Sequence, residues 1–302
     1  MLDILVRAGS FVFIILLGYG LKRIGFFKEA DFTLLSRITI RITLSAAIIC
    51  NLASVQIEPS LLSLALLGIG GGILYIALGI LTNLGKDKER KAFDLLNLTG
   101  YNIGCFTMPF AQSFLGPMGV LTCSLFDMGN SVICLGGAVS IASMVKSGSG
   151  FSWKRILRSL LSSAPFICYL VMLFLNMVGL RLPEPVVSCA QMISNANAFM
   201  AMLTIGVGFK LGGEISQIGR LGKLLVIRYT LAAALALVYY FVLPFPLEVR
   251  QALVILAFSP IGSVMPGFTG EMGGDVGLSS ALNSISILIS IVIIMAVLSV
   301  ML

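Results

Sequence analysis

The feature that most constrains this sequence is a series of long apolar runs separated by short charged patches. Each run can cross a bilayer, which takes about 20 apolar residues in a helix. Only 11% of the residues are charged and 58% are hydrophobic, whereas soluble chains are about 25% charged. We therefore predict an all-α membrane protein rather than a nucleic-acid-binding, secreted or cytosolic catalytic one. The ten runs lie near residues 4–21, 32–53, 60–84, 92–115, 118–145, 156–178, 185–207, 221–243, 249–270 and 276–302.

The residue types present exclude several kinds of chemistry. The chain has no histidine, which rules out Ser/His/Asp triads, histidine metal ligands and histidine proton relays. No GxxxxGK[ST] phosphate-binding loop occurs. The cysteines lie in apolar stretches and never as CxxC, so we expect small buried hydrophobic residues rather than disulfides or a zinc site. We predict no catalytic residue, no metal and no cofactor. The six cysteines are Cys50, Cys105, Cys123, Cys134, Cys168 and Cys189.

Basic residues are distributed very unevenly among the connections between the runs. The odd-numbered connections hold most of them, whereas the even-numbered connections and the N-terminus hold only Arg7, Arg181 and Arg250. Because basic loops stay in the cytoplasm, the odd-numbered connections are expected inside and both termini outside. The residues on the basic side are Lys22, Arg23, Lys28, Lys86, Lys88, Arg90, Lys91, Lys146, Lys154, Arg155, Arg158, Lys210, Arg220 and Lys223.

Ten spans with five in each half predict two inverted five-helix repeats, because an odd number of spans leaves the second half upside down. The predicted domains are residues 1–146, a cytoplasmic linker at 147–154, and residues 155–302. The prolines of the two halves lie in corresponding spans, since Pro109 in span four is matched by Pro260 and Pro266 in span nine.

Proline removes a backbone donor and clashes with the preceding turn, so spans four and nine are expected to break near the middle of the membrane. Broken backbone is tolerated there only inside protein or beside a watered cavity. Paired interruptions in two halves point to the substrate site of a transporter, where half-helix N-termini favour an anion. The alternative is that these prolines only kink continuous helices.

Four sequence patterns support a family resemblance. They are Gly18 to Phe27 (GYGLKRIGFF), residues 35–45 (LSRI…ITLS), Asn102 to Pro109 (NIGCFTMP) and Asp127 to Asn130 (DMGN). In their order and spacing over ten spans, they resemble the bacterial branch of the auxin efflux carrier family of permeases, which is related in fold to bile acid:sodium symporters. Three positions depart from the family pattern: Ser45 replaces a proline, Thr107 replaces a glycine, and Val264 stands where span nine usually has asparagine.

The resemblance implies crossing broken helices 4 and 9, a scaffold of spans 1, 2, 6 and 7, and a mobile transport domain of spans 3–5 and 8–10. It also implies transport of organic anions, which are auxins in plants and dicarboxylates in bacteria. A location in the bacterial cytoplasmic membrane and a homodimer through the scaffold helices are further expectations. The departure at Val264 indicates that the substrate differs from that of other members.

Polar residues near the two breaks are the candidate substrate contacts. Asparagine donates and accepts hydrogen bonds without carrying charge, which suits a carboxylate whose charge is met by helix ends. The alternative for each is a structural bond to the broken backbone. The candidates, with the prolines of the breaks, are Asn102, Pro109, Asn130, Ser259, Pro260, Ser263, Pro266 and Asn283.

Two charged positions within the spans carry separate hypotheses. An ionised Asp127 inside a span costs at least about 2.5 kcal/mol unless paired, so we assign it to coupling with H⁺ or Na⁺. The alternative is a protonated or interface-level carboxyl that caps a neighbouring backbone break. Arg37 and Arg41 share a helix face, and Arg41 is the candidate for attracting anions at the cytoplasmic mouth. The alternative is that both snorkel to the interface.

The function these observations favour is a secondary-active transporter of small organic anions, such as mono- or dicarboxylates, working as an elevator. The alternatives are a sodium-coupled symporter of the bile-acid type and an anion channel. An intramembrane enzyme is disfavoured, because only Asp127 and Asp94 are acids near the membrane interior. The expected partners are the anion and membrane lipid, and no nucleic acid.

Overall fold

The computed structural model of the chain describes residues 2–53, 55–148, 150–210 and 217–302, and within them every regular element is a helix. This confirms the all-α prediction for these residues. The elements, with η2 a 3-10 turn and the other η segments π-helical turns, are α1 (Leu2–Arg23), α2 (Asp31–Ile38), η1 (Thr39–Leu44), α3 (Ser45–Ala53), η2 (Pro59–Leu62), α4 (Ser63–Leu81), α5 (Lys88–Leu98), η3 (Ile103–Thr107), α6 (Met108–Phe114), α7 (Gly116–Val132), η4 (Ile133–Gly137), α8 (Ala138–Ser147), α9 (Trp153–Leu161), α10 (Ala164–Met177), α11 (Glu184–Ser194), α12 (Asn197–Gly208), α13 (Ile218–Phe241), α14 (Leu247–Ala257), α15 (Met265–Glu271) and α16 (Val276–Met301).

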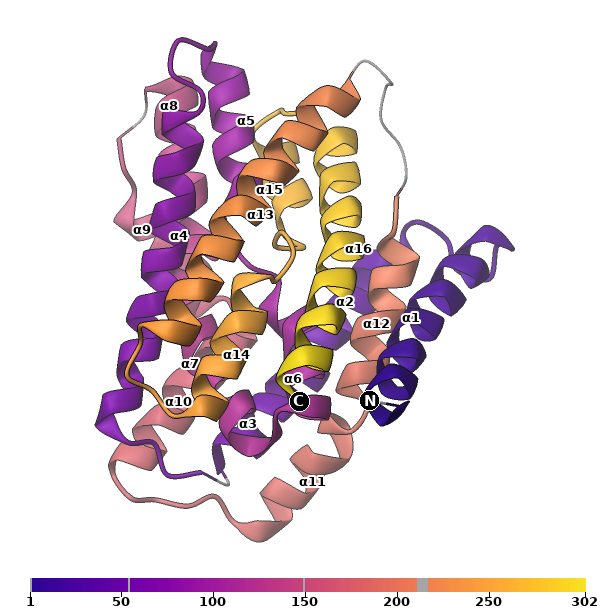
Figure 1. Cartoon of the computed structure of the whole chain (residues 1–302), viewed down its shortest axis with the longest axis vertical. Coiled ribbons are helices and arrows are strands. Elements are labelled where there is room, and N and C mark those ends of the chain that lie inside the picture. Colours follow the sequence, from indigo (N-terminus) through magenta and orange to yellow (C-terminus); the bar gives the residue numbers. More distant parts are fainter. Residues whose placement is uncertain (1, 54, 149, 211–216) are drawn as a thin grey trace.

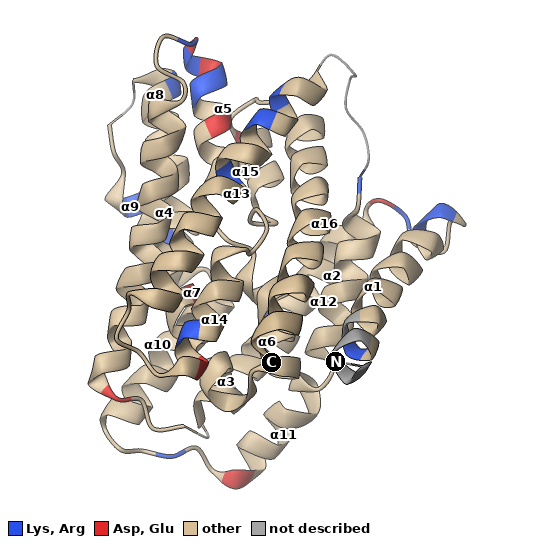
Figure 2. Ribbon diagram, viewed as in Figure 1, with Lys and Arg blue, Asp and Glu red and all other residues tan. Residues whose placement is uncertain are grey.

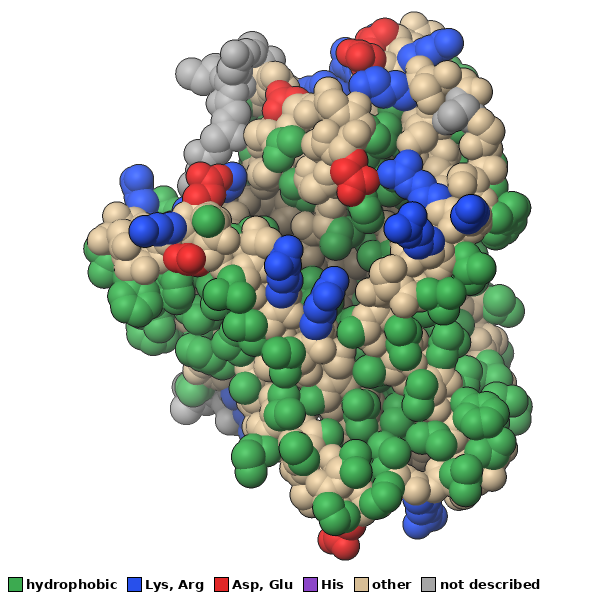
Figure 3. All heavy atoms as spheres, turned by 180° about the vertical axis from the view of Figure 1, so that it is seen from behind, with side chains coloured by type: hydrophobic (Ala, Val, Ile, Leu, Met, Phe, Trp, Pro, Cys, Tyr) green, Lys and Arg blue, Asp and Glu red, His purple; other side chains and the backbone are tan. Residues whose placement is uncertain are grey.

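The long helices lie side by side in one bundle (Figure 1). Six helices of the described chain are long and apolar enough to cross a membrane. Figure 3 shows apolar side chains over the middle and lower parts of one face, with most of the charged side chains above them. These features fit a membrane-embedded protein. The six helices are Asp31–Ala53, Pro59–Leu81, Gly116–Ser147, Glu184–Gly208, Ile218–Phe241 and Val276–Met301.

Charged residues gather at the ends of the bundle, and lysine and arginine concentrate at the upper end in Figure 2. The start of α1 and the end of α16 lie toward the opposite end (Figure 1). At the basic end Lys210 forms an ion pair with Glu29, and this hydrogen bond and positive charge lower the pKa of the Glu29 carboxyl. The uneven distribution of basic residues along the sequence thus corresponds to a difference in charge between the two ends of the molecule.

The predicted sixth span, residues 156–178, is not one straight helix. It divides into α9 and α10, which meet at 80° across residues 162–163. The Ser163 side chain accepts a hydrogen bond from the Phe166 N–H, and Pro165 lies in the first turn, so α10 starts afresh. On α9, Ile156 and Leu160 are buried while the basic residues are exposed. The two parts of this apolar run therefore point in different directions.

Both predicted breaks are present in the described chain. After α5 the chain is non-helical at residues 99–102, where Gly100 has φ +83°, a value that favours glycine. After α14 it is non-helical at residues 258–262, with Pro260 inside the break, and then turns into α15. Pro109 and Pro266 instead occupy the first turn of α6 and α15. Pro266 thus begins the helix after the second break, whereas the helical turns after the first break begin at Ile103, upstream of Pro109.

Two helix pairs pack so closely that glycine is required at the contact. A Cβ on Gly206 of α12 would overlap the Ile15 carbonyl oxygen of α1. A Cβ on Gly129 of α7 would overlap the Ala65 carbonyl oxygen of α4. Such close approach is typical of helix pairs in membranes, where small residues let the backbones meet.

Candidate functional site

The two broken segments meet inside the bundle. α5 approaches from the upper end and α14 from the lower end in Figure 1. The backbone N–H of Asn102 donates a 2.9 Å hydrogen bond to the carbonyl of Pro260. Beside it, the hydroxyls of Thr107 and Ser259 lie 2.5 Å apart. All four residues are buried. We call the region formed by residues 99–107 and 258–264 the crossing.

A buried arginine joins the two segments. Arg228 of α13 is 1% exposed, and its guanidinium donates to the carbonyls of Leu98 at 2.6 Å, Gly100 at 2.9 Å and Ser259 at 2.9 Å. These carbonyls lie just beyond or at the C-terminal ends of α5 and α14, where partial negative charge favours a cation. The Arg228 guanidinium also lies 4.8 Å from the ring centre of Tyr75.

Sequence reasoning left Arg228 without a role. The available signal was its position well inside an apolar run, because a charged residue at membrane depth is functional by default. Nothing in the run indicated which backbone groups it would reach, since they lie about 30 to 130 residues away along the chain.

Asn130 and Asn283 are bound to the broken backbone. The Asn130 side chain accepts from the Tyr101 N–H and donates to the Tyr101 carbonyl, both at 3.1 Å. The Asn283 side chain donates to the carbonyl of Ile261 at 2.8 Å. Asn130 lies on α7 and Asn283 on α16, each the second α-helix after its break, and each asparagine hydrogen-bonds to the broken backbone. For these two residues the hydrogen bonds support the structural alternative.

Asn102 differs from them, because its side chain is buried but unpaired. Its Nδ2 has no hydrogen-bond partner among the described residues, and only its backbone groups take part in the crossing. A buried amide donor without an acceptor is costly unless something else supplies one. Asn102 therefore remains the predicted ligand contact with a free donor. Ser263 lies half-buried directly before α15.

Asp127 is buried on α7 and fully engaged. One oxygen accepts from the Asn130 side chain and the other from the hydroxyl of Tyr169 on α10, both at 3.0 Å. A line of hydrogen bonds thus runs from Tyr169 through Asp127 and Asn130 to the backbone of Tyr101. Protonation of the carboxylate would remove acceptor capacity from this line.

The predicted basic mouth is separate from the crossing. Arg37 and Arg41 are both exposed, whereas the crossing is buried. Among the cysteines, Cys50, Cys105, Cys123 and Cys134 are buried as expected and free, whereas Cys168 is half-buried and Cys189 is exposed, so the prediction of buried cysteines is wrong for these two.

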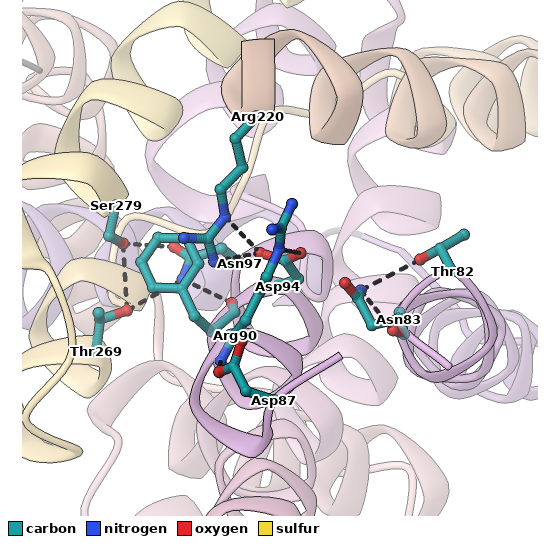
Figure 4. Close-up of polar contacts among 11 residues, drawn as sticks. Thr82, Asn83, Asp87, Arg90, Asp94, Asn97, Arg220, Thr269 and Ser279 are labelled. Atoms are coloured by element: carbon teal, nitrogen blue, oxygen red, sulfur yellow. Dashed lines mark hydrogen bonds and ion pairs between the residues drawn. The ribbon is translucent and has the colours of Figure 1, made fainter. Parts of the chain in front are cut away.

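A second polar cluster lies nearer the basic end (Figure 4). The buried carboxylate of Asp94 accepts two bonds from Arg220, at 2.6 and 3.1 Å. One turn further along α5, Asn97 hydrogen-bonds to Thr269 of α15 and Ser279 of α16. Asp94, which the sequence marked only as an acid near the interior, is thus ion-paired. The described residues contain no group of three or more Cys, Asp or Glu arranged to hold a metal.

The chain matches no protein-family model and no curated protein sequence. The class of this protein is therefore defined by its fold. It is an all-helical, membrane-embedded chain whose two broken helices meet at a buried crossing held by Arg228.

Proposed function

We propose that this chain is a secondary-active transporter of small organic anions. The observation that carries the proposal is the crossing, in which the Asn102 N–H and the Pro260 carbonyl join two interrupted helices inside the protein. Broken backbone at membrane depth is tolerated only inside protein or beside a water-filled cavity, and paired interruptions in two halves are the strongest sequence pointer to a transporter's substrate site.

An anionic substrate is supported by the polar groups at the crossing. Arg228 brings a positive charge into the protein interior, and within the described chain its guanidinium hydrogen-bonds to backbone carbonyls and not to a carboxylate. The free Nδ2 of Asn102 is a donor, as a carboxylate oxygen requires. Thr107 and Ser259 add hydroxyls at the same place. Asp127 on α7 is a nearby negative group, and its two oxygens accept hydrogen bonds from Asn130 and Tyr169.

The proposal includes ten spans arranged as two inverted repeats. It is supported by contacts that recur between the halves: α1 packs on α12 as α10 packs on α3, and α4 packs on α5 as α13 packs on α14. The pair α6 and α7 likewise corresponds to α15 and α16. The same architecture is the one implied by the resemblance to auxin efflux carriers, so we propose membership of that family and a location in the cytoplasmic membrane.

The proposed mechanism is an elevator, in which spans 3–5 and 8–10 slide against a scaffold of spans 1, 2, 6 and 7. The close glycine contacts lie within these bodies, Gly206 in the scaffold and Gly129 in the transport domain. A scaffold homodimer belongs to the same proposal. H⁺ or Na⁺ remains the candidate coupling ion, with Asp127 as the residue that responds to it.

The test combines binding and flux. Purified protein is screened by thermal shift against mono- and dicarboxylates, because a ligand that binds only the folded state raises the melting temperature. The best ligand is then followed in proteoliposomes. Saturable uptake with counter-exchange supports the carrier, whereas ohmic single-channel currents would establish a channel. Uptake lost when sodium is replaced by potassium would favour the sodium symporter, and failure of every anion to bind or move would reject the proposal.

A further inference from the structure

The carbonyl groups around Arg228 form a cage of a recognisable kind. The carbonyls of Leu98, at the end of α5, and of Gly100 and Ser259, in the two breaks, all accept hydrogen bonds from one guanidinium. The rings of Tyr75 and Tyr101 lie 4.8 and 5.6 Å from the guanidinium carbon. Helix C-terminal carbonyls and aromatic faces both favour a cation. Together they make a cation-binding cage.

We propose that this cage is a cation site filled by the chain's own arginine. Unwound carbonyls and half-helix C-termini are the groups that coordinate a dissociable cation in transporters with broken helices. Here the same kinds of group are satisfied by a guanidinium attached to α13. The carbonyls therefore carry a permanent cation, and sodium is not needed to join the two breaks.

The geometry explains why the tethered group is an arginine. A planar guanidinium presents several N–H donors in a fixed fork, whereas an ammonium is a compact point charge. The Nη1 of Arg228 reaches Leu98 and the Nη2 reaches both Gly100 and Ser259, so the fork spans the two breaks. Tyr75 also donates to the backbone carbonyl of Arg228 at 3.2 Å, which fixes this turn of α13 against α4.

Removing the side chain should expose an empty cage that a free cation can enter. In sodium-free buffer, Arg228→Ala is expected to melt below wild type. Guanidinium chloride at about 1 to 50 mM should restore at least about half of the loss, with saturation, since a weak ligand of the folded state stabilises in this way. Tetramethylammonium chloride at the same concentrations should not, because it donates no hydrogen bonds.

Two controls make the result specific. Arg37→Ala removes an exposed guanidinium, so its melting temperature should match wild type with and without guanidinium. Wild type itself should show no stabilisation by guanidinium and none by sodium, because its cage is full. If Arg228→Ala does not fold, Arg228→Lys decides, and it should melt below wild type because one ammonium cannot span three carbonyls.

Several outcomes would overturn the cage. They are an Arg228→Ala protein as stable as wild type, a variant indifferent to guanidinium, a lysine variant equal to wild type, or saturable stabilisation of wild type by sodium. For transport, we expect uptake to be unchanged when sodium is replaced by N-methylglucamine. This expectation rests on the proposed function. The cage is tested by melting temperature alone. If guanidinium restores the stability of Arg228→Ala but the protein moves no anion, the proposed transport function is rejected and the cage is not.

Discussion

The hydroxyl of Tyr169 donates a 3.0 Å hydrogen bond to the carboxylate of Asp127, which joins α10 to α7 inside the bundle. Asp127 accepts a second bond from Asn130, which in turn holds the backbone of Tyr101 at the first break. In the proposed elevator, α10 belongs to the scaffold and α7 to the transport domain. The Tyr169–Asp127 bond therefore crosses the boundary along which the two bodies would slide.

Asp127→Asn tests whether this carboxylate couples transport to protons. The amide keeps one acceptor oxygen but cannot bind and release a proton. We expect wild-type accumulation to rise by up to about tenfold per unit of inward pH gradient, since one pH unit is worth about 1.36 kcal/mol. Asp127→Asn should lose this dependence in proteoliposome uptake. Tyr169→Phe, which keeps the carboxylate, should retain a gradient response. A gradient response in Asp127→Asn equal to wild type would contradict the assignment.

Asn102→Ala should weaken ligand binding without loosening the fold. Its Nδ2 has no partner to lose within the described chain, so the melting temperature of the unliganded protein should stay near wild type. A hydrogen bond to a charged ligand is worth about 1.5–3 kcal/mol, so affinity should fall about tenfold to a hundredfold by calorimetric titration. Unchanged affinity would remove Asn102 from the site.

Asn130→Ala, in contrast to Asn102→Ala, should destabilise the unliganded protein. This substitution deprives the Tyr101 N–H and carbonyl of their partner, and each buried group left unpaired costs about 1–3 kcal/mol. We expect a clearly lower melting temperature before any ligand is added. A melting temperature equal to wild type would show that the asparagine does not hold the break.

Gly129→Ala should disrupt the contact between α7 and α4. The added methyl would overlap the Ala65 carbonyl oxygen, and backbone cannot move aside as a flexible side chain can, so we expect a loss of at least about 2 kcal/mol. Gly70→Ala on α4 is the matched control, because a methyl there meets nothing within 4 Å. It should be neutral or gain up to about 1 kcal/mol from helix propensity. Equal melting temperatures for the two variants would refute the close packing.

Arg220→Ala should cost more stability than Arg155→Ala. Arg220 pairs with Asp94, whose side chain is 4% exposed, so the substitution leaves a nearly buried carboxylate whose remaining ion pair within the described chain is the longer 4.0 Å contact to Arg90. Breaking a fully buried pair costs about 3–5 kcal/mol, and partial exposure of Arg220 reduces this to about 1–3. The Arg155–Glu271 pair is exposed on both sides and is worth about 0–1 kcal/mol. Thermal unfolding of both variants compares them, and a larger loss for Arg155→Ala would contradict the ranking.

Much of the architecture could be predicted because it is written in local composition. Apolar runs with few charges form helices in a membrane-embedded chain, since the backbone N–H and C=O groups must hydrogen-bond to one another where water is absent. The proline and glycine positions located both interruptions to within several residues. The first break lies upstream of Pro109, because Gly100 turns the chain with a positive φ and the helical turns of η3 already begin at Ile103.

The identity of the free and the engaged polar groups could not be predicted in this way. Asn102 and Asn130 are the same residue type in similar surroundings, but only the structure shows that the Asn130 amide binds Tyr101 and that the Asn102 Nδ2 has no partner within the described chain. The sequence alone determined that this chain is helical, apolar and interrupted at two places, because those properties depend on neighbouring residues. The tertiary structure decided that the two interruptions join and that Arg228 binds both, because contacts between residues far apart in the chain arise only when the helices pack.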